Sequence, residues 1–258
     1  YFLLSVFHAH PIIPVVSVDR STEHNQAVVS AIDEKIISSN TVAFRITEED
    51  FINFDLIHGD IQDQVQEVFD KFENIDLIFD CRVCINSNAE QLADLICAFN
   101  SKFCDEFNVR KIIITGSSIP ASIADIASVN SEENIERIEL EIFDKVQSKI
   151  GSDYHLTLGD YGAVSPNYSD VDIPGGAMRN ITAPKIIYPY GREVSVIRGA
   201  ALATHPLGNG QYAGLLANLV AKPFFRGKSY SFGEKYIEEK SRGVGSGVGP
   251  TTMVKPLC

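Results

Sequence analysis

Acidic and basic side chains recur in this sequence where runs of apolar, β-branched residues end. Such runs predict buried strands, so the polar residues that follow them are positioned to meet a ligand at the strand ends. Arginine binds carboxylate or phosphate through its planar fork, whereas an acid can orient arginine, transfer a proton or hold a cation. The residues expected to bind a ligand are Asp19, Arg20, Arg45, Arg82, Ser117 and Arg198. The candidates for catalysis are Asp80, Asp160 and Tyr161.

The alternation of side chains along a strand groups some of these candidates. In the strand predicted at 75–82, Asp80 and Arg82 lie on one face, and Arg45 lies on one face with Thr47 in the strand at 41–47. If these faces meet, acids and arginines converge in one place. Such an arrangement is either an anion-binding site or a structural ring of salt bridges, and the residue types allow both.

The predicted elements alternate along the chain. Strands are expected at 12–18, 41–47, 75–82, 111–118 and 155–164, and apolar residues at helical spacing predict helices at 21–39, 60–72, 88–107 and 134–150. The first helix begins at Ser21, a typical N-cap residue. This alternation predicts an α/β fold with a parallel sheet and right-handed crossovers.

Polar residues at nearly every strand end favour a (β/α) TIM-barrel-like fold, because a barrel builds its site from all of these loops. A doubly wound sheet would concentrate its site at one switch point. We expect a single barrel-like domain over 1–258, with regular βα units in 1–166. The rest comprises a long loop at 170–185, two strands around a Tyr-Gly-Arg turn in 186–199, an amphipathic helix at 211–225 and a glycine-rich tail at 243–256. Because the chain begins at Tyr1 and not at methionine, we expect N-terminal barrel units to be missing.

Composition excludes several classes of protein. The net charge of -12 disfavours a general nucleic-acid coat and binding to anionic membranes. Five cysteines, an odd number, indicate free thiols in a reducing cytoplasm. The apolar opening at 1–16 is interrupted by prolines and histidines and lacks a basic leader, so it predicts a strand and no membrane helix.

Three local motifs give weaker evidence of a functional site. Cys81 and Cys84 have the spacing of a redox or zinc pair, but no second pair accompanies them, so two packed thiols are the preferred interpretation. His8 and His10 share a strand face without further ligands, and the turn at 116–118 suits a phosphate or an ordinary loop. We assign no metal, and the cofactor and oligomeric state stay open.

Several short segments together resemble the beta-family proteins of bacteria and phages. These segments are IIPVVSVDR, GDYGAVSP, APKIIY, VIRG, QYAGLLANLV, FRGKSYSFGEKYI and the GVGP-TT tail. The resemblance implies a barrel-type α/β fold and a family whose biochemistry is largely uncharacterised. By motif position it carries over Asp19, Arg20, Arg137, Glu139, Gly159, Asp160, Tyr161, Arg198, Gly199 and Gly233. The family's tryptophans and last histidine-containing segment are absent from this chain.

Two functions fit these residues. The first is a site for a small anionic ligand, nucleotide- or phosphate-like, at the C-terminal mouth of the barrel, with hydrolysis by Asp80 or Asp160 as acid or base. The alternative is a non-catalytic module that binds a protein partner in conflict between phage and host. Whether the protein is an enzyme is left open by the sequence.

Overall fold

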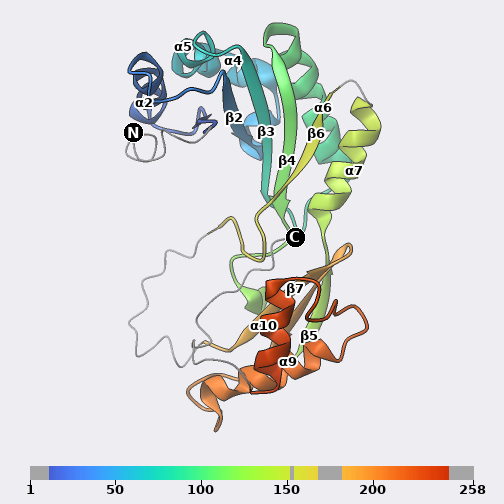
Figure 1. Cartoon of the computed structure of the whole chain (residues 1–258). Helices are drawn as coiled ribbons and strands as arrows, with labels where there is room; N and C mark the ends of the chain where they lie inside the picture. The colour runs from blue at the N-terminus through green and yellow to red at the C-terminus, as the bar shows by residue number, and fades with distance from the viewer. Residues whose placement is uncertain (1–11, 152–153, 168–181, 244–258) are drawn as a thin grey trace. The chain divides into compact units, whose positions relative to one another are not determined.

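The computed structural model describes residues 12–151, 154–167 and 182–243 (Figure 1). His8, His10, most of the loop at 170–185 and nearly all of the glycine-rich tail lie outside these residues. The chain divides into two compact units where the sequence predicts a single barrel-like domain. Unit 1 comprises residues 1–116 and 138–160, and unit 2 comprises residues 117–137 and 161–258.

Unit 1 is a parallel sheet alternating with helices, as the sequence predicts. Its strands lie side by side in the order β1-β2-β3-β4-β6. They are β1 (Val15–Val16), β2 (Thr41–Thr47), β3 (Asn74–Val83), β4 (Val109–Ser117) and β6 (Leu156–Asp160). The helices are α2 (Thr22–Asp33), α3 (Glu48–Phe51), α4 (Phe54–Gln64), α5 (Gln66–Phe69), α6 (Ala89–Glu106) and α7 (Ile138–Ile150).

The strand order of unit 1 follows the chain, which is also the order within a (β/α) barrel. The sheet is nevertheless open: β1 and β6 are its edges, and no closed barrel is found in the part of the chain that the structure describes. A parallel sheet whose strands advance in one direction with right-handed crossovers collects its helices on one face. The opposite face of the sheet carries Arg45 and Asp80, whereas Asp160 lies by register on the same face as the core residues Ile112 and Ile114.

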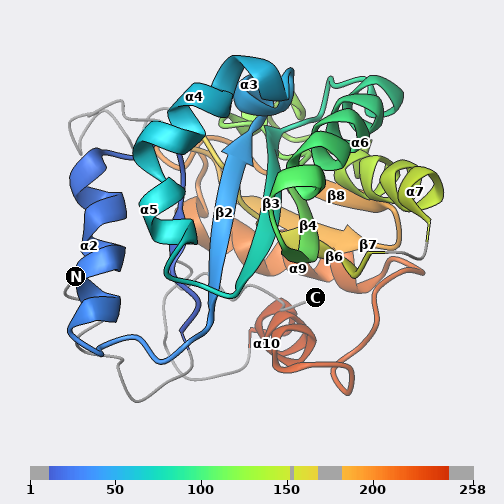
Figure 2. The same ribbon diagram turned by 90° about the horizontal axis from the view of Figure 1, so that it is seen from above.

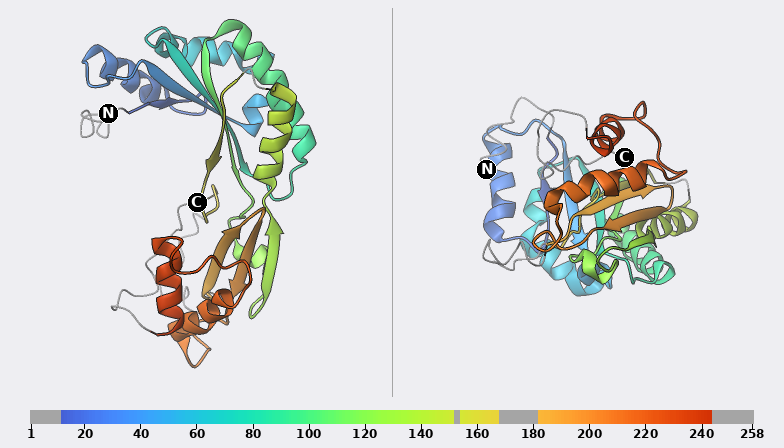
Figure 3. Two further views of the ribbon diagram at one scale, coloured as in Figure 1. Left: turned by 45° about the vertical axis from the view of Figure 1, so that its right-hand side comes forward. Right: turned by 90° about the horizontal axis from the view of Figure 1, so that it is seen from below.

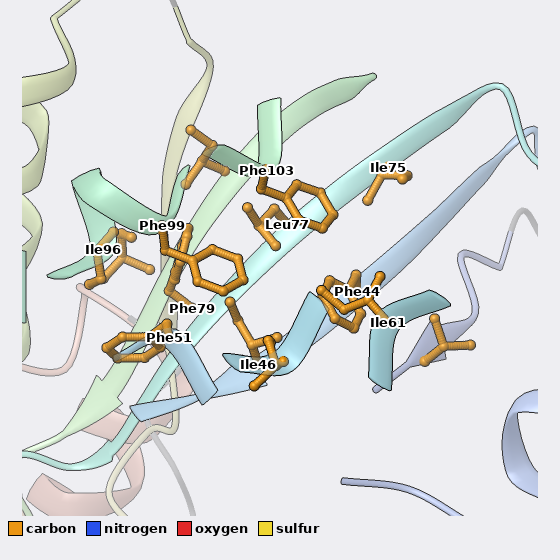
Figure 4. Close-up of a cluster of buried hydrophobic side chains, with 14 of the residues drawn as sticks. Phe44, Ile46, Phe51, Ile61, Ile75, Leu77, Phe79, Ile96, Phe99 and Phe103 are labelled. Atoms are coloured by element: carbon orange, nitrogen blue, oxygen red, sulfur yellow. The ribbon is translucent and has the colours of Figure 1, made fainter. Parts of the chain in front are cut away.

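Alternate residues of the central strands build the core of unit 1 (Figure 4). Phe44 in β2 and Phe79 in β3 are fully buried in one apolar cluster with residues from α2, α4, α5, α6 and α7. Phe103 of α6 stacks on Phe44, with ring centroids 5.6 Å apart. The residues that alternate with these core residues along β2 and β3, such as Arg45 and Asp80, therefore point away from this core.

Unit 2 is a three-stranded antiparallel sheet with the order β5-β8-β7. Its elements are β5 (Glu132–Glu136), β7 (Lys185–Tyr190), β8 (Glu193–Arg198), the 3-10 turns η1 (Ile123–Asp125) and η2 (Gly208–Gly210), and the helices α9 (Gln211–Val220) and α10 (Phe232–Ser241). The helix α9 lies along one face of the sheet (Figure 3). Ile186, Tyr188 and Ile197 on that face pack with side chains of α9 and α10. The other face packs against residues of the segment 119–127.

The helix expected at 21–39 ends at Asp33, and the one expected at 60–72 is divided into α4 and α5. Two further expected boundaries are wrong for identifiable reasons. Residues 134–136, predicted as the start of a helix, belong to β5 because they pair with β8, and the helix α7 begins only at Ile138. The helix expected at 211–225 ends at Val220, three residues before Pro223, which cannot continue a helix. The hairpin at the Tyr-Gly-Arg turn is confirmed, with Gly191 at the positive φ of 49°.

No helix in the described ranges combines the length and apolar composition needed to cross a bilayer.

Replacing Phe103 by alanine tests the packing of unit 1. Phe103 has no exposed surface and contacts several other aromatic rings, so we expect a loss of about 3–5 kcal/mol in the free energy of unfolding. Leu56→Ala is the control, because Leu56 is 74% exposed on α4 and should change stability by less than about 0.5 kcal/mol. Urea unfolding followed by circular dichroism measures both, and equal losses would contradict the assignment of Phe103 to the core.

Glu90 should make unit 1 sensitive to acid. The helices α6 and α7 lie side by side (Figure 2), and Glu90 on α6 accepts from Lys145 at 2.7 Å and Lys149 at 2.5 Å on α7. Hydrogen bonds from the two lysines, together with their charges, lower the pKa of Glu90 from 4.5 to about 2. A folded-state pKa below the unfolded value stabilises the fold fully above pH 4.5, and this contribution is lost as pH falls to about 2.

The measurement compares urea midpoints of wild type and Glu90→Gln across this pH range. Wild type should be the more stable at neutral pH, and the difference should shrink toward pH 2. Asp63→Asn, an exposed acid on α4 outside this network, is the matched control. A difference that is constant with pH would show that the ion pairs do not act through the charge of Glu90.

Candidate functional site

The carboxyl ends of four parallel strands bring most of the candidate residues to one edge of unit 1. In the register of the sheet, Thr47 of β2 lies opposite Asp80 of β3, and Gly116 of β4 lies opposite Asp160 of β6. The loop that carries Asp19 follows β1 at the same edge. We call this region the carboxyl edge of unit 1, defined by Asp19, Arg20, Arg45, Asp80, Arg82, Glu139 and Asp160.

A buried ion pair joins the second and third strands at this edge. The Arg45 guanidinium donates through Nε to Oδ2 of Asp80 at 2.8 Å, and its Nη2 lies 2.8 Å from the same oxygen. The Asp80 side chain is only 1% exposed and that of Arg45 16%. A buried carboxylate is costly without a cation at this distance, so the two residues depend on each other.

Asp19 completes a three-residue network. Arg45 donates through Nη1 to Oδ2 of Asp19 at 3.0 Å, and Arg20 lies 3.9 Å from the other oxygen. Partial burial acts to raise the pKa of Asp19, but hydrogen bonds from Ser17 and Arg45 and the charges of both arginines outweigh it and lower that pKa. Burial likewise acts to lower the pKa of Arg45, but the charges and hydrogen bonds of Asp80 and Asp19 outweigh it and raise that pKa.

The loop that carries Asp19 is held in place by a buried amide. Asn25 of α2 donates from Nδ2 to the carbonyl of Ser17 at 3.0 Å and accepts from the amide of Ser17 at 3.4 Å. The Ser21 side chain accepts from His24 N at 3.3 Å and caps the helix, as the sequence predicts. The helix α2 therefore positions Asp19 and Arg20 relative to the end of β1.

Arg82 adopts a backbone conformation that is unfavourable for a residue with a side chain. Its φ is 48°, in the left-handed region, at the end of β3. The turn directs the Arg82 amide toward Oδ1 of Asp80, which accepts it at 2.9 Å. Asp80 thus uses one oxygen for Arg45 and the other for the backbone of Arg82, and the Arg82 side chain is exposed.

Glu139 is a buried acid that was not among the candidate site residues. It lies in the first turn of α7 and is 6% exposed. A Cβ on Gly116 would lie 3.4 Å from Cβ of Glu139 and 3.3 Å from Cβ of Cys81 and Sγ of Cys84. Glycine at 116 therefore lets α7 and the end of β3 pack closely against β4. The sequence signal was the Arg-Ile-Glu segment that the family resemblance carried over, without a role attached to it.

Cys81 and Cys84 are packed thiols, as the sequence predicts. Both are buried and neither forms a disulfide, and burial raises the pKa of Cys81 well above its usual range, with Cys84 and Asp80 adding to this. A thiol of raised pKa is a poor nucleophile and metal ligand. In the described part of the chain, no group of three or more His, Cys, Asp and Glu side chains is arranged to hold a metal ion.

Asp160 is, like Asp19, an exposed acid of the carboxyl edge. It ends β6 and follows Gly159, whose missing Cβ would lie 2.8 Å from Cβ of Thr115. The close approach of β4 and β6 therefore requires glycine at 159, and this explains the glycine before the acid in the GDYG segment. Tyr161, the next residue, belongs to unit 2 and is half-buried.

Ser117 and Arg198 also belong to unit 2. Ser117 is 3% exposed, donates to the carbonyl of Val164 at 3.1 Å and accepts from the amide of Ile119 at 3.1 Å. These two bonds fit a turn-stabilising residue better than a ligand contact. Arg198 donates through Nη1 to the carbonyl of Ala127 at 2.7 Å.

Unit 2 contains a polar network around Glu234, which the sequence analysis does not predict. Glu234 of α10 has no exposed surface; Tyr188 donates to it at 3.1 Å, Arg226 lies 2.9 Å away, and Ser231 donates to its second oxygen. Burial acts to raise the pKa of Glu234, but the hydrogen bond from Ser231 and the charge of Arg226 lower it. Serine three residues before glutamate is the pattern of a capping box, so the sequence could have identified this pair.

The fold and this edge define an α/β protein with an acid–arginine network at the carboxyl ends of a parallel sheet. The family model described as Beta protein matches residues 2–255, and the chain belongs to this family. No curated protein and no solved structure matches the chain.

A double-mutant cycle tests the mutual dependence of Arg45 and Asp80. Each of Arg45→Met and Asp80→Leu leaves one buried charge without its partner, so we expect either change alone to cost about 3–5 kcal/mol. The double variant should cost less than the sum, because it removes both charges together. Urea unfolding at neutral pH measures all four proteins. Additive losses would show that the two residues do not stabilise each other.

Proposed function

We propose that the carboxyl edge of unit 1 binds a small anionic ligand that carries a phosphate or carboxylate group, such as a nucleotide. The observation that carries the proposal is Arg82, a non-glycine residue in the left-handed region whose side chain is exposed at the strand ends. Backbone strain of this kind persists only where the surroundings impose it, and it clusters at ligand sites. Here the imposing contact is the bond from the Arg82 amide to Asp80.

The neighbouring arginines support the same ligand class. Arg45 is oriented by carboxylates on two sides, which preorganises its planar fork. Arg20, whose side chain is 55% exposed, can turn toward an anion from its 3.9 Å position beside Asp19. Arginine is suited to phosphate because two parallel N–H groups meet two oxygens. We propose Arg20 and Arg82 for direct contact and Arg45 for the electrostatic field behind them.

The acids at this edge have separate roles in the proposal. Both oxygens of Asp80 already accept hydrogen bonds, so we assign it to orienting Arg45 and Arg82 rather than to proton transfer. Asp160 is exposed at the end of β6, two strands along the sheet from Asp80, which corresponds to about 10 Å at the usual strand spacing. By register it lies on the face of the sheet opposite to that of Asp80, at the strand ends where loops from both faces meet. A small ligand can span this distance, so we propose Asp160 for acid or base catalysis if the ligand is hydrolysed.

The strand order supports the barrel-like character that we propose for unit 1. The strands follow the chain and the apolar cluster gathers the helices on one face, which leaves the strand ends as the place where loops converge. A cytoplasmic location in a bacterium or phage-infected cell remains part of the proposal, based on the cysteine content and the family.

One observation favours a second candidate function, binding of a protein partner through unit 2. Tyr230 is 57% exposed and Phe232 75% exposed, and the Arg226 guanidinium lies 4.1 Å from the centroid of the Tyr230 ring. Exposed aromatic residues beside arginine are enriched where proteins bind each other tightly. We propose this surface for the interaction module considered from the sequence.

Arg82→Gly removes the guanidinium of Arg82 but keeps the left-handed backbone conformation at this position. Glycine adopts the left-handed conformation without strain, so the turn should persist and the protein should gain stability, up to about 1 kcal/mol. Ligand binding should nevertheless weaken, because the guanidinium is lost. Thermal-shift assays with pyrophosphate, nucleoside monophosphates and citrate measure this loss of binding. A ligand at 100 times its Kd stabilises the folded protein by about 2.7 kcal/mol, which raises its melting temperature.

Lys35→Gly is the matched control. Lys35 has a φ of 58° and follows α2, so this variant also relieves a left-handed residue and removes one positive charge, but away from the strand ends. We expect it to keep the ligand-induced shift of the wild type. Equal shifts in all three proteins, or no shift with any anion, would overturn the anion site and leave the protein-partner function to be tested by Tyr230→Ala and Phe232→Ala.

A further inference from the structure

Two cations face each other in the sheet of unit 2. In the antiparallel register of β7 and β8, Lys185 lies directly opposite Arg198. Side chains at directly opposite positions share a face and have Cβ atoms about 5 Å apart, and like charges there are destabilising. The strand pairing therefore holds two positive charges together against their repulsion.

Neither cation has an acidic partner among the residues that the structure describes. Other cations of unit 2 do: Lys222 lies 2.6 Å from Glu132, and Arg242 lies 2.6 Å from Glu238. In a chain with 34 acidic and 22 basic residues, an uncompensated pair of cations is unusual. The nearest acid on the same face by register is Glu133, opposite Val196, and it forms no ion pair with Arg198.

The backbone fixes the position of Arg198. Its Nη1 donates to the carbonyl of Ala127 at 2.7 Å, and its amide donates to the carbonyl of Ser131 at 2.9 Å. The next residue is Gly199, where a Cβ would lie 2.8 Å from Pro184 and 2.9 Å from Gln211. This close packing holds the ends of β7 and β8 together, and the bond to Ala127 anchors the guanidinium through one nitrogen on the sheet face that Arg198 shares with Lys185.

The titration of Lys185 agrees with this geometry. Much of the surface of Lys185 is exposed to solvent, but partial burial of its amine lowers the pKa of that group. The positive charge of Arg198 lowers this pKa further. An anion between the two side chains would reverse both effects, because it would favour the charged amine.

We propose that Lys185 and Arg198 form an oxyanion-binding site, built from unit 2 residues alone, that takes a phosphate group. The planar fork of arginine matches two oxygens of phosphate, and the ammonium of lysine acts as a point charge on a third. The group can belong to free phosphate or to a phosphate monoester. This site does not depend on the function proposed for unit 1.

Lysine NMR tests the proposal on the whole chain. The protein is reductively methylated with ¹³C-formaldehyde, and the Lys185 signal, assigned with Lys185→Gln, is titrated with pH in inorganic phosphate and in chloride of equal ionic strength. We expect phosphate to raise the pKa of Lys185 selectively. A Lys185 titration that is the same in both salts, or a shift shared by all lysines, would overturn the site.

Isothermal titration of unmethylated protein with inorganic phosphate supplies the second readout. Arg198→Gln should weaken binding about tenfold or more, since it removes a charge-assisted hydrogen bond, whereas Lys185→Arg keeps two cations and should keep binding. Arg242→Gln removes a charge elsewhere in unit 2 and should have no effect. Equal affinity in Arg198→Gln and wild type would contradict the proposal.

Two further experiments identify the source of the phosphate and distinguish the Lys185–Arg198 site from the carboxyl edge of unit 1. Adenosine monophosphate that binds more tightly than inorganic phosphate, with the same Lys185 response, assigns the site to a phosphate monoester, and equal binding assigns it to the phosphate group alone. Arg82→Gly, which tests the carboxyl edge of unit 1, should leave the Lys185 response unchanged. Loss of the response in Arg82→Gly would refute a site made by Lys185 and Arg198 alone.

Discussion

The carboxyl edge of unit 1 depends on one guanidinium, that of Arg45. Asp80 can be buried at the end of β3 only because Arg45 meets it at 2.8 Å, and the same guanidinium reaches Asp19 in the loop after β1. Three consecutive βα connections are therefore tied together by one side chain. An uncompensated buried carboxylate would cost several kcal/mol, so the network constrains every loop that meets it. Whatever the edge binds must be accommodated around these fixed charges.

The backbone at the strand ends follows from the same constraint. Asp80 uses its second oxygen for the Arg82 amide, and this bond accompanies a left-handed turn that places the Arg82 side chain at the surface. At β4 and β6 the determinant is steric: Gly116 and Gly159 stand where a Cβ would meet Glu139, Cys81 and Thr115. Hydrogen bonding thus shapes one half of the edge, and close approach of the backbone shapes the other.

Unit 2 also contains a buried acid that links separate elements through hydrogen bonds and an ion pair. Its segment 117–137 is inserted between β4 and α7, and its small antiparallel sheet packs helices on one face. The buried Glu234 joins α10 to β7 through Tyr188 and to the preceding loop through Arg226. Arg226, Lys222 and Arg242 each lie 2.6–2.9 Å from a glutamate, whereas the Lys185 and Arg198 pair on the opposite face of the sheet has no such partner among the described residues.

The sequence by itself determined the alternation of strands and helices, the N-cap at Ser21, the hairpin around Gly191 and the strand-end positions of Arg45, Asp80 and Asp160. These features follow from local periodicity and turn chemistry, which neighbouring residues encode. Tertiary structure decided that the sheet stays open, that residues 132–136 pair with β8 as a strand, and that Arg198 and Ser117 belong to unit 2. It also decided the partners of Arg45 and the burial of Glu139 and Glu234. Such outcomes depend on which distant segments meet, and spacing along one chain does not encode these distances.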